Sequence, residues 1–220
     1  MNTALLIPSY NASATLPLLL ERVVRFVPAG SVVVVNDGST DGTGAVAALK
    51  GVIVLHHAQN SGKGAALRTG FRYCVEQGFD AVITMDADLQ HDPERIPAFI
   101  DAFTTGRYDI IIGSRMEETT GMPFHRWFSN TLTSLLVRLR TGAPIPDSQS
   151  GYRMIGRKVL ETVSTRADGF EAETELLIRA AAAGFRFGAV PIPTIYAGEK
   201  SHMTHLSTTI NFIRTLLFTR

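Results

Sequence analysis

Ala81-Val82-Ile83-Thr84-Met85-Asp86-Ala87-Asp88 is the stretch that decides the fold, because an apolar run of strand type ends there on two carboxylates. Its β-branched first half is typical of a strand buried in a sheet. Two carboxylates beside a buried strand are costly unless a cation or several hydrogen-bond donors compensate them. Oxygen ligands of this kind suit Mg²⁺ or Mn²⁺, and Gln90 adds a further oxygen. An isolated Asp-x-Asp is common, however, and a solvated turn at a strand end would have the same sequence.

Short β-branched runs like this one recur along the first half of the chain, with longer segments of helical period between them. In chain order, these runs and helical segments are residues 4–7, 16–27, 32–35, 43–49, 52–55, 64–77, 81–84, 94–103 and 110–112. Such alternation predicts right-handed crossovers and an open, mostly parallel twisted sheet with helices on both faces. The predicted class is therefore α/β, with a ligand crevice beyond the carboxyl ends of the strands.

The pattern changes after about residue 113, where we expect two helices, at 124–140 and 171–183, and a striped terminal segment. A chain of 220 residues suits one domain with a large core. We therefore expect a single catalytic domain over residues 1–220. Residues 1–113 would form its nucleotide-binding half and residues 114–220 its acceptor half and lid.

The composition gives the chain no overall electrostatic bias toward a charged partner, so any anion site must be built locally. Lys and Arg number 21 against 20 Asp and Glu, so the net charge of +1 gives no bias toward nucleic acid. The single Cys74 cannot form an internal disulfide and is expected to fill the core, which fits a reducing compartment. The six histidines show no zinc-site spacing. Without a signal sequence or a spanning segment, we expect a cytoplasmic protein.

Two loops that follow predicted strands carry polar residues suited to a nucleotide. Pro8-Ser9-Tyr10-Asn11 follows the first strand and Asn36-Asp37-Gly38-Ser39 follows the second. Asp37 lies where a carboxylate would bond a base or a ribose in the crevice. The other interpretation is a tight turn that continues into N-capping by Ser39, Thr40 or Asp41.

A third loop, Asn60-Ser61-Gly62-Lys63-Gly64, lacks the spacing of a P-loop, and no G-x-G-x-x-G follows a strand. ATPase and dinucleotide oxidoreductase activities are therefore disfavoured. The loop either brings its backbone and Lys63 close to a nucleotide or is only a loop and helix cap. Arg115, Arg126 and Arg153 could form an anion site if they converge, although each alone is also compatible with a surface arginine.

In their order along the chain, these motifs resemble the family 2 glycosyltransferases, and most of all the dolichol-phosphate mannose synthase branch. The likeness extends over nearly the whole chain. The stretches that carry it are Ile7-Pro8-Ser9-Tyr10-Asn11, VNDGSTDGT at 35–43, Gly62-Lys63-Gly64-Ala65-Ala66-Leu67, MDADLQHDP at 85–93, and Ser150-Gly151-Tyr152-Arg153.

This resemblance implies a GT-A fold and an inverting transfer of a hexose from a GDP- or UDP-sugar, such as GDP-mannose or UDP-glucose, often to a polyprenyl phosphate. It also implies a set of residues around the donor, with Pro8, Tyr10 and Asp37 at the base and ribose. The full set expected to contact the donor is Pro8, Ser9, Tyr10, Asn11, Asn36, Asp37, Gly38, Ser39, Lys63, Gly64, Asp86, Ala87 and Asp88.

For the metal, the resemblance implies Asp86, Asp88 and Gln90, which would surround Mg²⁺ or Mn²⁺ and the diphosphate. Arg115 and Arg126 would face the acceptor phosphate, and Asp147 would lie near the reacting centre. Together these three are the expected catalytic residues.

The acceptor stays open at this point, because Asn36 stands where the family often has an acid. A lipid phosphate is already an anion and needs little general-base help. A glycan hydroxyl would need a base, for which Asp147 comes first and Glu171 or Glu173 second. A non-catalytic nucleotide-sugar-binding module is the alternative from another class of protein.

Two amphipathic segments are expected to cover apolar surface. The helix at 124–140 carries a stripe of large apolar residues, and the terminal segment places Leu206, Ile210, Ile213 and Leu217 on one face. Each stripe either packs into the core or lies on the inner face of a membrane as a peripheral contact. A homo-oligomer also stays open.

Overall fold

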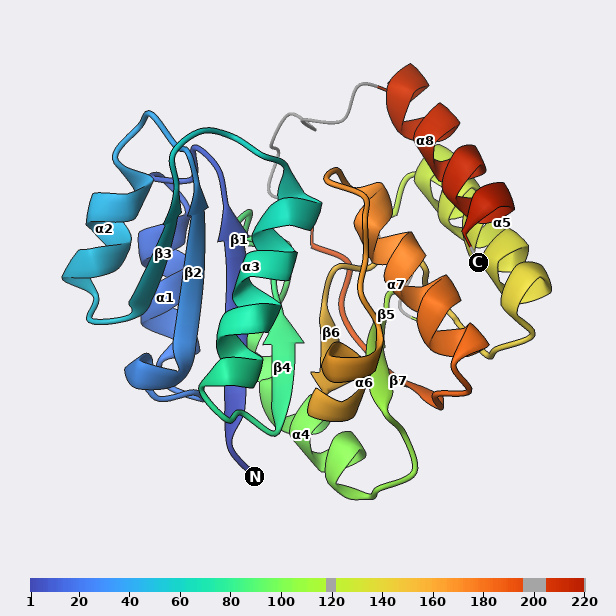
Figure 1. Ribbon diagram of the computed structural model, residues 1–220, viewed down its shortest axis with the longest axis horizontal. Helices are drawn as coiled ribbons and strands as arrows, with labels where there is room; N and C mark the ends of the chain where they lie inside the picture. Colours follow the sequence, from blue (N-terminus) through green and yellow to red (C-terminus); the bar gives the residue numbers. More distant parts are fainter. Residues whose placement is uncertain (118–121, 196–204, 220) are drawn as a thin grey trace.

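A seven-stranded sheet forms the centre of the molecule (Figure 1). The computed structural model describes residues 1–117, 122–195 and 205–219, with only the backbone at 205–208. The strand order is β3-β2-β1-β4-β6-β5-β7, and β6 alone among the described strands is antiparallel to its neighbours. The strands are β1 (Thr3–Ser9), β2 (Val32–Asp37), β3 (Ile53–His57), β4 (Ala81–Thr84), β5 (Ile110–Ser114), β6 (Arg153–Gly156) and β7 (Phe187–Pro191).

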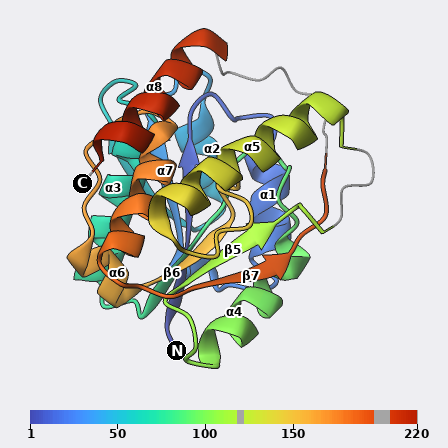
Figure 2. The same cartoon turned by 90° about the vertical axis from the view of Figure 1, so that its right-hand side faces the viewer.

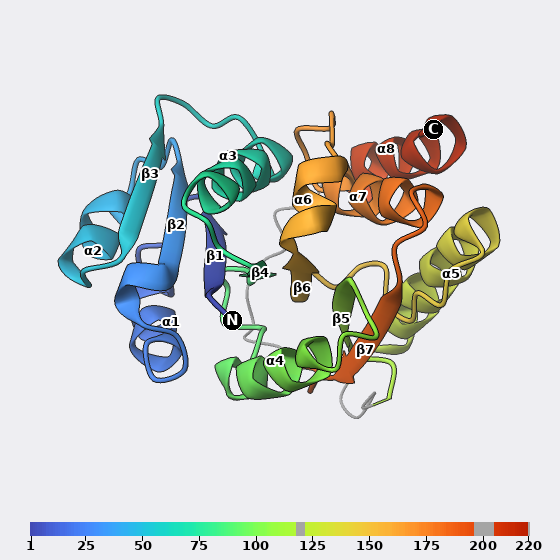
Figure 3. The ribbon, with the colours of Figure 1, turned by 60° about the horizontal axis from the view of Figure 1, so that its bottom comes forward.

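Helices cover both faces of this sheet (Figure 3). The α-helices are α1 (Leu16–Val23), α2 (Thr43–Leu49), α3 (Lys63–Glu76), α4 (Ile96–Thr104), α5 (Phe124–Thr141), α6 (Arg157–Thr162), α7 (Glu171–Ala182) and α8 (His205–Phe218). Short 3₁₀ turns precede β2 (η1, Ala29–Ser31) and α4 (η2, Pro93–Arg95).

The core is built from strand side chains that alternate between the two faces. In β1, Leu5 and Ile7 pack with α1 and α4, whereas Ala4 and Leu6 pack with α3. All four side chains are fully buried, as expected for a central strand covered on both faces. The five predicted strands and the predicted α/β class are therefore confirmed.

Two details of the predicted elements are wrong. The helix expected at 94–103 begins only at Ile96, because Asp92 accepts from the Glu94 N–H and starts η2 instead. The second half also holds two strands that were not predicted, β6 and β7. Because β6 pairs with β4 and β5, the two halves of the chain interleave in one continuous sheet.

The terminal helix α8 does not turn the described part of its predicted stripe, at 210, 213 and 217, to the core, so the first of the two alternatives for this stripe is wrong. Phe212 and Leu216 face the core, while Ile210, Ile213 and Leu217 are exposed. The fourth residue of the predicted stripe, Leu206, lies outside the side chains that the structure describes. Figure 2 shows α8 and α5 lying alongside α7 on the outside of the molecule. No helix in the described ranges is both long and apolar enough to cross a membrane.

Candidate active site

The carboxyl ends of β1, β2 and β4 lie side by side, and the loops that follow β1 and β2 are joined there. The Asn11 N–H donates to Ser39 Oγ at 3.0 Å, and Asn11 Oδ1 accepts from the Thr40 N–H at 2.9 Å. Asn11 adopts a positive φ of 49°, which turns the loop toward β2. The structure thus brings together the two loops at 8–11 and 36–39 that we expected to contact a nucleotide.

Asp37 lies at the end of β2, but its carboxylate is already bonded within the protein. It lies 2.6 Å from His57 Nδ1 and accepts from the backbone N–H groups of Ser61 and Gly62 at 2.9 and 2.8 Å. These bonds hold the loop before α3 against β2. The sequence interpretation missed His57, although it pairs with Asp37 in the register of β2 and β3.

Asp86 and Asp88 leave β4 as predicted, and each side chain has a partner. The Lys63 Nζ lies 2.6 Å from Asp86 Oδ1, and Asp88 Oδ1 accepts from the Gln90 N–H at 3.0 Å. Burial alone would raise the pKa of Asp86, but the nearby Lys63 ammonium outweighs it and lowers that pKa. Asp86 is therefore ionised at neutral pH. Leu89, between Asp88 and Gln90, has a positive φ of 63°, which makes the turn tight.

His91 fixes the backbone of this turn. Its Nδ1 accepts from the Asp86 N–H at 3.1 Å, and its ring stacks on Tyr152 with centroids 5.0 Å apart. Burial lowers the pKa of His91 to about 4, with Asp86 opposing that shift. The imidazole is therefore neutral at pH 7, and its proton is on Nε2 because Nδ1 is an acceptor. This role was not predicted, although His91 lies in the motif at 85–93.

The turn fits a divalent cation that is shared with phosphate. Among the described residues, no three His, Cys, Asp or Glu side chains gather into a metal cage. Mg²⁺ needs only one or two protein carboxylates when phosphate oxygens and water complete its shell. The Asp88 carboxylate, the second Asp86 oxygen and the Gln90 amide are oxygen ligands of the kind that supply such contacts, and their role at a metal stays a prediction.

Arg115 and Asp147 form a two-pronged ion pair on the other side of the crevice. Arg115 Nε lies 2.8 Å from Asp147 Oδ2, and its Nη2 lies 3.0 Å from Oδ1. The Asp147 carboxylate is fully buried and also accepts from the Gln149 N–H at 3.2 Å. Arg126 lies in the exposed first turn of α5.

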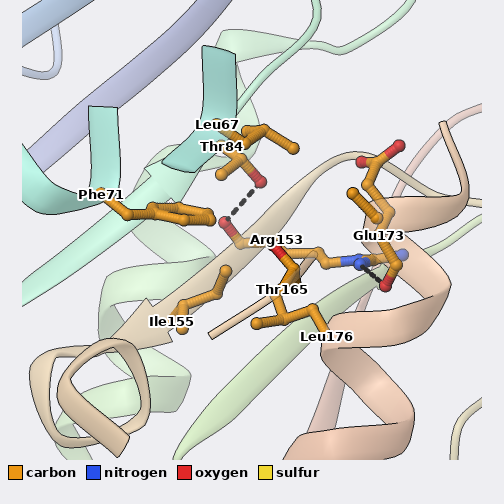
Figure 4. Close-up of a pocket in the computed structure, with 9 residues that line it drawn as sticks. Leu67, Phe71, Thr84, Arg153, Ile155, Thr165, Glu173 and Leu176 are labelled. Atoms are coloured by element: carbon orange, nitrogen blue, oxygen red, sulfur yellow. Dashed lines mark hydrogen bonds between the residues drawn. The ribbon is translucent and has the colours of Figure 1, made fainter. Parts of the chain in front are cut away.

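Arg153 is buried, so neither alternative from the sequence, an anion-binding arginine or a surface arginine, describes it. Arg153 is 1% exposed, and one of its Nη atoms donates to the Glu173 carbonyl at 2.8 Å (Figure 4). The other Nη atom donates to the Ser148 carbonyl at 3.0 Å. A short strand, β6, carries it into the core. The guanidinium therefore holds the backbone at Ser148 and Glu173 in place and is not available to bind a substrate.

Charged groups from both halves of the chain meet around His91. Asp86 and Lys63 come from the first half, Asp147 from the second, and all three act on the pKa of His91. Arg115, just after β5, contributes as well. The carboxylate turn at 86–90 and the Arg115–Asp147 pair therefore lie near the same imidazole.

Comparisons with known proteins agree with this architecture. Residues 4–164 match the model of glycosyl transferase family 2. An undecaprenyl-phosphate mannosyltransferase of Micrococcus luteus is 34% identical over 203 residues, which are 87% of this chain and 83% of that protein. A polyprenol monophosphomannose synthase of Mycolicibacterium smegmatis is 36% identical over 202 residues, which are 86% of this chain and 76% of that protein.

Among solved structures, glucosyl-3-phosphoglycerate synthase from Mycobacterium tuberculosis shares the fold. Its complex with phosphoglyceric acid superposes with a TM-score of 0.80 at 21% identity, over 98% of this chain and 78% of that one. Its complex with Mn²⁺, UDP and glucosyl-3-phosphoglycerate gives a TM-score of 0.78 at 20% identity, over the same shares. This likeness confirms the GT-A type of α/β fold. With a family match over most of its length, the chain belongs to glycosyl transferase family 2.

Proposed function

We propose that the protein is an inverting, cation-dependent hexosyltransferase that moves a sugar from a nucleotide-diphospho-sugar to a polyprenyl phosphate. Of two relatives at 34% and 36% identity, one is named an undecaprenyl-phosphate mannosyltransferase and the other a polyprenol monophosphomannose synthase. Structural neighbours were solved with Mn²⁺ or Mg²⁺ and UDP. GDP-mannose is therefore the first donor to test, and UDP-glucose the second.

The observation that carries the choice of acceptor is the pairing of the candidate bases. Asp147 is bonded through both carboxylate oxygens to Arg115, and Glu173 lies 3.0 Å from the Lys63 ammonium. A carboxylate oxygen that is bonded to a cation is not free to take a proton from a hydroxyl acceptor. An acceptor that is already an anion needs no base, and it is attracted by Arg115. Both features favour a phosphate over a hydroxyl.

In the proposed reaction an acceptor phosphate oxygen attacks C1 of the sugar from the side opposite the diphosphate. The bond from C1 to the diphosphate oxygen breaks, and its electron pair leaves with the nucleoside diphosphate, so C1 inverts. When bound, Mg²⁺ or Mn²⁺ would offset the charge that develops on the diphosphate. Arg115 would orient the acceptor phosphate, and Asp147 would hold the Arg115 side chain.

The donor would lie along the joined loops of the first half. Tyr10, 44% exposed, offers a ring surface just after β1. Gly38 and Gly64 serve the loops themselves, because a Cβ at Gly38 would clash with the Gln59 backbone and one at Gly64 would clash with the Ala167 carbonyl oxygen. Asp37 would support the binding of the base or ribose mainly indirectly. Its carboxylate is bonded to the loop at 58–62 and holds that loop in place.

A lipid acceptor also requires contact with a membrane surface, and α5 and α8 offer one (Figure 2). Their outward side chains include ten exposed large apolar residues: Phe124, Trp127, Phe128, Leu132, Leu135, Leu139, Ile210, Ile213, Leu217 and Phe218. The two helices carry four arginines, three in α5 and one in α8, and no acidic residue. An apolar face with cationic side chains is typical of a helix that lies on anionic lipid. We propose peripheral binding through this α5/α8 face.

Transfer assays with paired acceptors test the proposed function. Labelled GDP-mannose or UDP-glucose is incubated with Mn²⁺ and either a polyprenyl phosphate or the matching polyprenol. We expect labelled lipid with the phosphate alone. Arg115→Ala should lower kcat/KM by roughly 30-fold or more, because it leaves the buried Asp147 charge unpaired.

The alternative acceptor chemistry would give a different result in the same assay. If Asp147 acts as a base, Asp147→Asn abolishes transfer to hydroxyl acceptors and spares transfer to phosphate. Equal labelling of polyprenol and polyprenyl phosphate would contradict the proposal. So would the absence of sugar transfer from every nucleotide-sugar tested.

A further inference from the structure

The Lys63 ammonium lies between two carboxylates from opposite halves of the chain. Its Nζ is 2.6 Å from Asp86 Oδ1 and 3.0 Å from Glu173 Oε2. The Lys63 and Glu173 side chains are only 13% and 14% exposed. The Phe170 ring, 5.7 Å from Nζ, lies close on another side. An ion pair so little exposed is poorly screened by solvent and salt.

Tight packing around these charges leaves them little freedom. A side chain at Gly151 would place its Cβ 2.8 Å from Asp86 Oδ2, 3.0 Å from Glu173 Oε1 and 3.1 Å from Lys63 Nζ. Behind them, Arg153 donates to the Glu173 carbonyl and fixes the first turn of α7 (Figure 4). The glycine and the arginine of the Ser-Gly-Tyr-Arg motif therefore shape the space in which Lys63 and Glu173 meet.

The first turn of α3, which carries Lys63, is docked on the segment just before α7. The Gly64 N–H donates to the Asp168 carbonyl at 2.7 Å, and Arg68 bonds the Ala167 carbonyl and the Asp168 carboxylate. The Lys63–Glu173 pair is the most enclosed ionic part of this contact. Through it, the position of α7 acts on the carboxylate that leaves β4.

We propose that Lys63 and Glu173 form a positioning pair that orients Asp86 for the donor. Lys63 bonds Asp86 Oδ1, and Asp86 Oδ2 lies beside Gly151, so the ammonium and the glycine together set the direction of the carboxylate. Glu173 holds the ammonium in place and is neither a base nor a substrate contact. The inference rests on the proposed function, since it assumes that Asp86 serves a nucleotide diphosphate and its cation.

Removing either partner should have different consequences. Without Glu173, Lys63 keeps its bond to Asp86 but loses the second anchor that sets its direction. Without Lys63, Asp86 and Glu173 face one another as unpaired, largely buried carboxylates, and ionising both becomes costly. A residue that acts through a partner loses its effect once that partner is gone.

The test measures binding of GDP and UDP with Mn²⁺ by titration calorimetry on the full chain. Glu173→Gln keeps the shape and removes the charge, and it should weaken nucleotide binding about tenfold, as changes around metal ligands commonly do. Lys63→Met should weaken binding further, and Lys63→Arg should restore much of it. The double variant Lys63→Met with Glu173→Gln should bind no worse than Lys63→Met alone.

Glu161→Gln is the matched control, because it removes a surface carboxylate that pairs with Arg157 on α6. Thermal unfolding of every variant shows whether it is folded. If Glu173→Gln lowers the Tm but binds nucleotide like Glu161→Gln, the pair is only structural and the proposal is overturned. Additive losses in the double variant would overturn it too. If the wild-type chain binds neither nucleotide, the proposed function itself is contradicted. That outcome differs from the two above, in which wild type binds nucleotide and only the role of the Lys63–Glu173 pair is contradicted.

Discussion

At the scale of single residues, each candidate carboxylate of the crevice takes its role from the group that it bonds. Asp37 is held by His57, Asp86 by Lys63, and Asp147 by Arg115. The sequence could identify these acids by their positions at strand ends. It could not predict the partners, because Arg115 and Asp147 are 32 residues apart and meet only through the tertiary fold.

His91 predicts a pH dependence of stability for the metal-free protein. Burial lowers its pKa from 6.5 to about 4, whereas the unfolded chain titrates near 6.5. Between these pH values the unfolded state binds more protons, so the free energy of unfolding falls as pH falls. We expect a loss of about 2 kcal/mol from this group between pH 7.5 and pH 5.

Urea unfolding at these two pH values, with a chelator present, measures that loss. In His91→Gln the amide oxygen can still accept from the Asp86 N–H, but nothing titrates, so the difference between the two pH values should shrink. His125→Gln, in exposed α5, is the control and should behave like wild type. An equal pH dependence in His91→Gln and wild type would show that His91 is not held neutral.

At the scale of elements, segments with a clear helical period or a β-branched run were predictable, and the two strands without such a run were not. Thr43–Leu49 and Ala81–Thr84 have the predicted bounds. The strand β6 has four residues and begins with Arg153, and β7 contains Gly188 and Pro191, so neither has the β-branched run that marks a strand. These two segments become strands because β6 pairs with β4 and β5, and β7 pairs with β5. The local sequence does not show this pairing.

The sequence also could not show which face of α8 packs on the core. Its apolar residues lie on more than one side, so two different stripes satisfy the helical period. Arg140 on α5 donates to the carbonyls of Leu216 and Thr219 at 3.2 and 2.9 Å, which helps set the orientation of α8. That tertiary contact leaves Ile213 and Leu217 on the outside.

The α5/α8 face predicts binding to anionic vesicles. Trp127 is the only tryptophan in the sequence and is 38% exposed, so its fluorescence reports on this face directly. We expect a blue shift with anionic vesicles and little with neutral ones, because both apolar insertion and arginine attraction contribute. Phe128→Ser with Leu135→Ser and Ile213→Ser should lower vesicle partitioning at least tenfold, since burying one such side chain contributes about 1.5–3 kcal/mol.

Leu49→Ser on α2 is the control for this experiment, because Leu49 is 85% exposed and lies away from α5 and α8. It should bind vesicles like wild type. Partitioning that does not respond to the triple substitution would show that another surface meets the lipid. An unshifted Trp127 spectrum at saturating anionic vesicles would contradict the proposed contact.

At the scale of the whole molecule, the alternation of strands and helices was enough to predict the α/β class and the edge on which the crevice lies. The insertion of β6 between β4 and β5 was not predictable, yet it brings the second half of the chain against the first. The chain segment at 147–153 reaches the carboxylate turn by this route. Asp147 and Gly151 could thus be recognised as motif residues, but not their contacts.

The central claim is that the turn at Asp86 and Asp88 holds a nucleotide diphosphate together with a divalent cation. Calorimetric titration of GDP and UDP into wild type and Asp88→Ala, each with Mn²⁺ and with EDTA, tests it most directly. We predict that wild type binds nucleotide in Mn²⁺. Its affinity should fall about a hundredfold or more in EDTA or on Asp88→Ala, because loss of the cation or of a ligand should cost at least as much as changing a residue that only supports a ligand. Equal nucleotide affinity in Mn²⁺ and in EDTA, and equal affinity of wild type and Asp88→Ala, would contradict this claim.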